Sequence, residues 1–61
     1  MKLKKYLKDH SITQEEFGRR IGVKRLAVSR YLNGTRKPSS RTAMLIVKVT
    51  KRLVTLEDLY E

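Results

Sequence analysis

Apolar residues recur along this chain at the three- and four-residue spacing of amphipathic helices. Near the start, Leu3, Tyr6 and Leu7 share one helical face, and lysines occupy other positions of residues 2–10. This spacing predicts a helix that packs its apolar face against a core. Similar spacing returns in later segments, and the whole pattern predicts an all-α fold of five helices.

The second predicted helix begins at a capping box, Thr13-Gln14-Glu15-Glu16. In this motif the Thr13 hydroxyl accepts a hydrogen bond from the Glu16 amide, and the Glu16 carboxylate accepts one from the Thr13 amide. We therefore expect a helix from Gln14 to about Ile21, with Phe17 and Ile21 pointing inward. Gly22 is expected to end this helix, because glycine adopts a positive φ without steric cost.

A third helix is predicted from about Arg25 to Asn33-Gly34, with an apolar face formed by Val28, Tyr31 and Leu32. The preceding glycines then have one explanation. Two helices joined by a turn of about three or four residues form a helix-turn-helix. We expect Gly18 to permit their close approach, Gly22 to make the turn and Val23 to fill the gap beneath it.

Residues 41–52 are compatible with either a helix or a strand, because many of them are β-branched. The set Ala43, Ile46, Val47 and Thr50 has helical spacing, and Ser39 or Ser40 can cap a helix that starts here. We predict a helix, although residues 46–56 could instead pair as strands across a dimer. Thr55 resembles a further cap, before a short last helix that offers Leu56, Leu59 and Tyr60 for packing.

The length and charge of the chain narrow its function. Sixty-one residues allow one domain, residues 1–61, and the absence of cysteine excludes disulfides and thiolate zinc sites. Residues 1–13 carry four cations and one acid, residues 14–41 eight and two, and residues 42–61 three and three, which sums to +9. Such a field attracts a polyanion such as nucleic acid, an anionic membrane or an acidic protein.

Once its apolar residues turn inward, the third predicted helix exposes a polar and cationic face. A major groove about 12 Å wide admits one helix, and arginine can read guanine bidentately. The residues on this face are Arg25, Leu26, Ser29, Arg30 and Asn33. We expect phosphate contacts from Gln14, Lys24, Asn33, Thr35, Arg36 and Lys37.

The run "TQEEFGRRIGVKRLAVSRYLNGTRKPS" resembles the Cro/C-repressor (XRE-type) helix-turn-helix family, and "VTLEDLY" is similar to the last helix of small Cro-like repressors and related antitoxins. The resemblance covers about residues 11–60. It implies a lambda-repressor-like DNA-binding fold and a bacterial or phage repressor that binds a palindromic operator as a homodimer. The base contacts that it implies are Arg25, Leu26, Ser29 and Arg30. Two positions depart from the family pattern: Lys24 replaces a capping Ser or Thr, and Leu26 replaces a common polar reader.

Other functions find less support in the sequence. The single histidine and scattered carboxylates offer no nucleophile–base pair or metal set, so we expect no enzyme, cofactor or small-molecule ligand. An antitoxin whose main partner is a toxin stays an alternative. No membrane span or signal peptide is visible, which predicts a cytoplasmic, nucleoid-associated protein. We expect the dimer interface among exposed apolar residues of the C-terminal third, namely Leu53, Val54, Leu59 and Tyr60.

Overall fold

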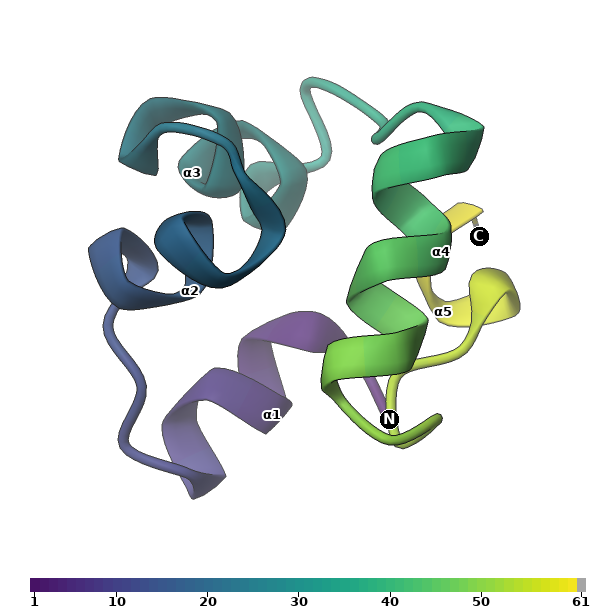
Figure 1. Ribbon diagram of the computed structural model, residues 1–61, viewed down its shortest axis with the longest axis horizontal. Helices are drawn as coiled ribbons and strands as arrows, with labels where there is room; N and C mark the ends of the chain where they lie inside the picture. The colour runs from purple at the N-terminus through teal and green to yellow at the C-terminus, as the bar shows by residue number, and fades with distance from the viewer. Residues whose placement is uncertain (61) are drawn as a thin grey trace.

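The computed structural model describes residues 1–60, which form five helices and contain no strand. The all-α prediction is confirmed. The helices are α1 (Leu3–Asp9), α2 (Gln14–Ile21), α3 (Arg25–Asn33), α4 (Ser40–Val49) and α5 (Leu56–Tyr60). Figure 1 shows α2 and α3 on one side of the molecule, α4 and α5 on the other, and α1 below them.

The core lies where α2, α3 and α4 meet. Phe17, Val28, Ile46 and Val54 are fully buried, each contributed by a different segment of the chain. The helical spacing predicted from the sequence accounts for most of the remaining core residues, which are Leu3, Tyr6, Leu7, Ile21, Ala43 and Leu59. Val23, Tyr31 and Leu32 are partly buried and pack against this cluster.

Local caps start three of the helices. The Thr13 hydroxyl accepts a hydrogen bond from the Glu16 amide at 3.1 Å, which is one of the two bonds of the predicted capping box. The other is not formed within the described residues, where the Glu16 carboxylate lies 3.7 Å from the Arg19 guanidinium instead. The Ser39 hydroxyl accepts from the Thr42 amide at 3.3 Å, which decides between the two serines proposed as the cap of α4. Thr55 begins α5, with its hydroxyl accepting from the Asp58 amide at 3.3 Å.

Asp58 completes this last cap and also joins it to the start of the chain. Its carboxylate accepts from the Thr55 amide at 2.9 Å and from the Met1 amine at 2.9 Å. These contacts, the Thr55 amide first, lower the pKa of Asp58 from 3.8 to about 2. The start of the chain accordingly lies beside the α4–α5 connection (Figure 1).

The segment that allowed two interpretations is helical, so pairing of residues 46–56 as strands is not what the structure shows. Helix α4 ends in a turn in which Lys51 and Arg52 have φ of 54° and 67°. The Lys51 amide donates to the Lys48 carbonyl and the Arg52 amide to the Val47 carbonyl, which is a Schellman arrangement built without glycine. The buried Thr50 hydroxyl accepts from the Val54 amide at 3.2 Å and holds the following residues against the helix.

The prediction of an exposed interface is wrong for two of its four residues. Val54 is fully buried and Leu59 is nearly so, because the turn after α4 folds α5 back onto the core. Leu53 and Tyr60 are exposed as predicted. The Tyr60 hydroxyl donates to the Pro38 carbonyl at 2.9 Å, so this side chain also ties α5 to the loop before α4.

Candidate nucleic-acid interface

Gly18 brings α2 against the turn that leads into α3. A Cβ at this position would lie 2.6 Å from the Val23 carbonyl oxygen, a distance that real side chains do not tolerate. The Val23 amide donates to the Gly18 carbonyl at 2.8 Å, and Gly22 between them has φ of 75°. The prediction that these glycines serve packing and turn geometry is therefore confirmed. The close contact is made by the turn backbone rather than by a side chain of α3.

This crossing fixes which face of α3 is covered. Val28 is fully buried, while Tyr31 and Leu32 are partly buried against the core. The opposite face of α3 carries the residues predicted to contact bases. Arg25, Leu26 and Arg30 are exposed on it, Leu26 by 56%, and Ser29 is partly buried.

The loop after α3 is held close to this face by one carbonyl group. The Arg30 carbonyl oxygen accepts hydrogen bonds from the Thr35 amide at 3.1 Å, the Arg36 amide at 3.3 Å and the Thr35 hydroxyl at 3.4 Å. Gly34, with φ of 76°, permits the reversal of the chain that these contacts require. The loop therefore presents Arg36 beside α3.

As a result, Arg30 and Arg36 line the same shallow depression, of about 380 Å³, together with Lys24 and Leu26. The sequence predicted roles for all four, and the structure brings them together. The depression is also lined by five residues for which the sequence predicted no DNA contact, namely Val23, Ala27, Tyr31, Ser39 and Thr42. Of these, Ser39 was recognisable in the sequence only as a possible cap of α4, and the approach of Ser39 and Thr42 to α3 depends on the path of the intervening loop.

The cations of this surface are not neutralised by acids within the part of the chain that the structure describes. Within residues 1–60, none of Lys24, Arg25, Arg30 and Arg36 forms an ion pair. The acids nearest along the chain, Glu15 and Glu16, are both engaged by Arg19, at 2.9 and 3.7 Å. The exposed face of α3 and the adjoining loop thus form an uncompensated positive surface, which favours a polyanionic ligand.

Four residues predicted to contact phosphate do not line the depression. Gln14 lies beside Lys4 and Lys8, in a separate hollow where α1 meets α2. The Lys37 ammonium donates to the Leu59 carbonyl at 3.5 Å, at the end of α5. Asn33 and Thr35 are both exposed, at the end of α3 and in the loop after it, but neither lines the depression.

Helix α3 starts without a side-chain cap. Lys24 occupies the N-cap position with extended backbone angles, and no side chain caps the helix there. This agrees with the departure noted in the sequence, where a capping Ser or Thr is replaced by a cation. The first turn of α3 is stabilised instead by its own backbone, since the Lys24 carbonyl accepts from the Ala27 amide at 3.0 Å.

Comparison with known proteins supports this geometry. A family model described as helix-turn-helix matches residues 3–59, which is nearly the whole chain. Comparisons with curated proteins and with solved structures give no match. In the part of the chain that the structure describes, no helix is long and apolar enough to cross a membrane.

Proposed function

This chain is a DNA-binding regulator of the Cro/C-repressor (XRE-type) helix-turn-helix family, and from this premise we propose that it is a repressor that binds a palindromic operator as a homodimer. Helix α3 enters the major groove. The observation that carries the proposal is the exposed face of α3, where the cations have no acidic partner within the described residues. A helix with such a face fits the width of the groove and the negative charge of DNA.

Within this proposal the residues divide into two roles. Arg25, Leu26, Ser29 and Arg30 face the base edges, where arginine recognises guanine and Leu26 meets a thymine methyl group. The residues that hold the phosphates are Gln14, Lys24, Asn33, Thr35, Arg36 and Lys37. Arg30 and Arg36 line the same depression but come from different segments, Arg30 from α3 and Arg36 from the loop after it. This supports base contact by Arg30 and phosphate contact by Arg36.

Dimerisation follows from the amount of sequence that one helix can read. A single recognition helix contacts only a few base pairs, and two-fold dimers on half-sites about 34 Å apart double that information. Of the predicted interface, Leu53 and Tyr60 remain candidates, because both are exposed apolar side chains in the C-terminal third.

Selection from random duplex DNA tests this function. The expected result is a palindromic consensus, with affinity that falls steeply with salt, by about 0.9 in log K per log salt for each phosphate contacted. A matched selection with Arg30→Ala should lose preference at one position of each half-site. Enrichment of no sequence, or an affinity that hardly changes with salt, would refute the proposed function.

A further inference from the structure

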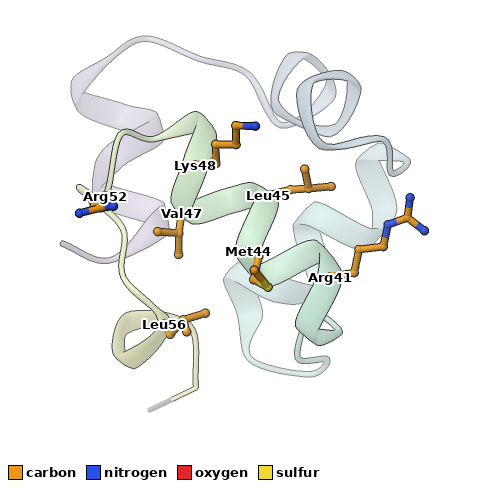
Figure 2. A pocket seen from close by; sticks show the side chains of 7 residues that line it. All are labelled: Arg41, Met44, Leu45, Val47, Lys48, Arg52 and Leu56. Carbon is orange, nitrogen blue, oxygen red and sulfur yellow. The ribbon is translucent and has the colours of Figure 1, made fainter.

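A second surface, distinct from the α3 face, lies between α4 and α5. It is a groove of about 580 Å³ whose apolar residues are Met44, Leu45, Val47 and Leu56. Figure 2 shows Met44, Val47 and Leu56 around the space between the two helices, whereas Leu45 points away from α5 in this view. Met44 is 66% exposed and Leu56 47% exposed, so large apolar groups meet solvent here. Contiguous exposed apolar surface of this kind marks a site of interaction.

Helix α4 is apolar on two sides, which its packing within the monomer does not explain. Ala43, Ile46 and Thr50 face the core and are buried. Met44 and Leu45 lie outside this set and are exposed. An amphipathic helix of a domain this small needs only one apolar face for its own core. The second apolar face is therefore available to a partner.

The groove is bordered by cations. Arg41, Lys48 and Arg52 also line it, no acid does, and none of the three forms an ion pair within residues 1–60. In Figure 2 the three side chains point outward around the apolar centre. Arg52 lies at the border of the groove because the left-handed turn after α4 directs the chain back toward α5.

These charges decide between two occupants. A second copy of the chain docked groove to groove would place its own three groove cations against these three. Against them it would offer mainly Glu57, the acid next to Leu56, which forms no ion pair within the described part of the chain. Repulsion would exceed attraction, whereas an acidic partner would neutralise the border of the groove.

We propose that this groove binds an acidic amphipathic α-helix of a partner protein. The partner helix inserts large apolar side chains such as leucine between α4 and α5. The carboxylates that flank these side chains face Arg41, Lys48 and Arg52. The ten residues of α4 span about 15 Å, which matches about three turns of a bound helix with anchors at i, i+3, i+4 and i+7. The proposal does not rest on the DNA-binding function.

A designed peptide tests the proposal on the full chain. The probe is a fluorescein-labelled helical peptide of about 15 residues with leucines on one face and glutamates beside them. Its control is a scrambled peptide of the same composition, which keeps the charge but has no apolar face. Fluorescence anisotropy should show the designed peptide binding about tenfold more tightly than the scrambled one. Equal affinities would overturn the proposal, because they would show attraction by net charge alone.

Variants of the protein locate the site. Met44→Ser should abolish the preference for the designed peptide, whereas Leu26→Ser, which removes a comparably exposed apolar group on α3, should retain it. Lys48→Glu should weaken binding several-fold more than Lys4→Glu, although both change the net charge equally. Circular dichroism verifies that each variant is folded. Equal effects within either pair would contradict the proposal.

The oligomeric state tests whether a second copy of the chain occupies the groove. Sedimentation equilibrium of the Met44→Ser variant should match that of the wild-type chain, with or without duplex DNA. A loss of dimers in this variant would overturn the proposal, because it would identify a second copy of the chain as the occupant of the groove.

Discussion

Replacing Gly18 by alanine tests the packing on which the proposed DNA-binding surface depends. The added Cβ would lie 2.6 Å from the Val23 carbonyl oxygen and 3.4 Å from the Lys24 carbonyl carbon. Both atoms belong to the backbone of the turn, which cannot rotate aside as a flexible side chain can. The turn is also held by the 2.8 Å hydrogen bond from the Val23 amide to the Gly18 carbonyl. The substitution must therefore displace α2 from the start of α3.

Two opposing effects set the magnitude. Alanine is favoured over glycine inside a helix by about 1 kcal/mol. Overpacking of a close contact costs about 1–3 kcal/mol. We expect Gly18→Ala to destabilise the domain by up to about 2 kcal/mol, and Gly18→Val by more, since valine is bulkier and a poorer helix former. For a domain of this size, each kcal/mol lowers Tm by about 4–8 °C.

Urea and thermal unfolding followed by circular dichroism measure these differences. Gly34 provides the matched control, because it has φ of 76° and open space around its Cβ position. Gly34→Asn should be tolerated better than Gly34→Ala, since asparagine adopts left-handed backbone angles more readily. At Gly18, where space and not φ is limiting, asparagine should be worse than alanine. A Gly18→Ala protein more stable than the wild type by about 1 kcal/mol, the helix propensity alone, would refute the argument.

Three further predictions follow from single contacts. Arg30→Ala should reduce the binding free energy by about 1–3 kcal/mol on the selected operator and by much less on random DNA, whereas Arg36→Ala should weaken binding to both DNAs alike. Titrations of both variants on both DNAs measure these losses. Equal losses everywhere would contradict a base-reading role for Arg30. Asp58 has a pKa lowered from 3.8 to about 2, so its carboxylate stabilises the fold above pH 3.8, and this contribution is lost as pH falls toward 2. The difference in unfolding free energy between the wild type and Asp58→Asn should therefore shrink across this window in acid unfolding experiments, and a constant difference would argue against the assignment. Lys51→Gly should raise the free energy of unfolding by up to about 1 kcal/mol, because φ at this position is 54° and glycine adopts such angles without strain. Lys48→Gly, inside α4, should lower it by about 1 kcal/mol. Urea unfolding that ranks the two variants the other way would contradict the left-handed turn.

Much of the fold and of the candidate site follows from local signals in the sequence. The starts of α2, α4 and α5 were predictable because each cap joins residues three positions apart, so the necessary groups are visible in one short segment. The exposed face of α3 was predictable for a similar reason, since helical periodicity opposes Arg30 to the buried Val28.

Turns without glycine carried no such signal. Ser11 has φ of 54°, as Lys51 does, and both follow helices that end in Schellman hydrogen bonds. Nothing in these residue types favours left-handed angles. The strain is offset by the hydrogen bonds of the turn and by the packing of the residues that follow, which depends on distant parts of the chain.

Tertiary structure alone decided which apolar residues of the C-terminal third are covered. Val54 and Leu59 are buried while Leu53 and Leu56 are exposed, although all four are equally apolar in sequence. The buried Thr50 hydroxyl and the turn after α4 set the direction in which α5 returns to the core. Burial is a sum over contacts with segments far apart in the chain, whereas periodicity describes only one element at a time. For that reason the sequence predicted the exposed cationic face of α3, but the groove between α4 and α5 became visible only in the assembled fold.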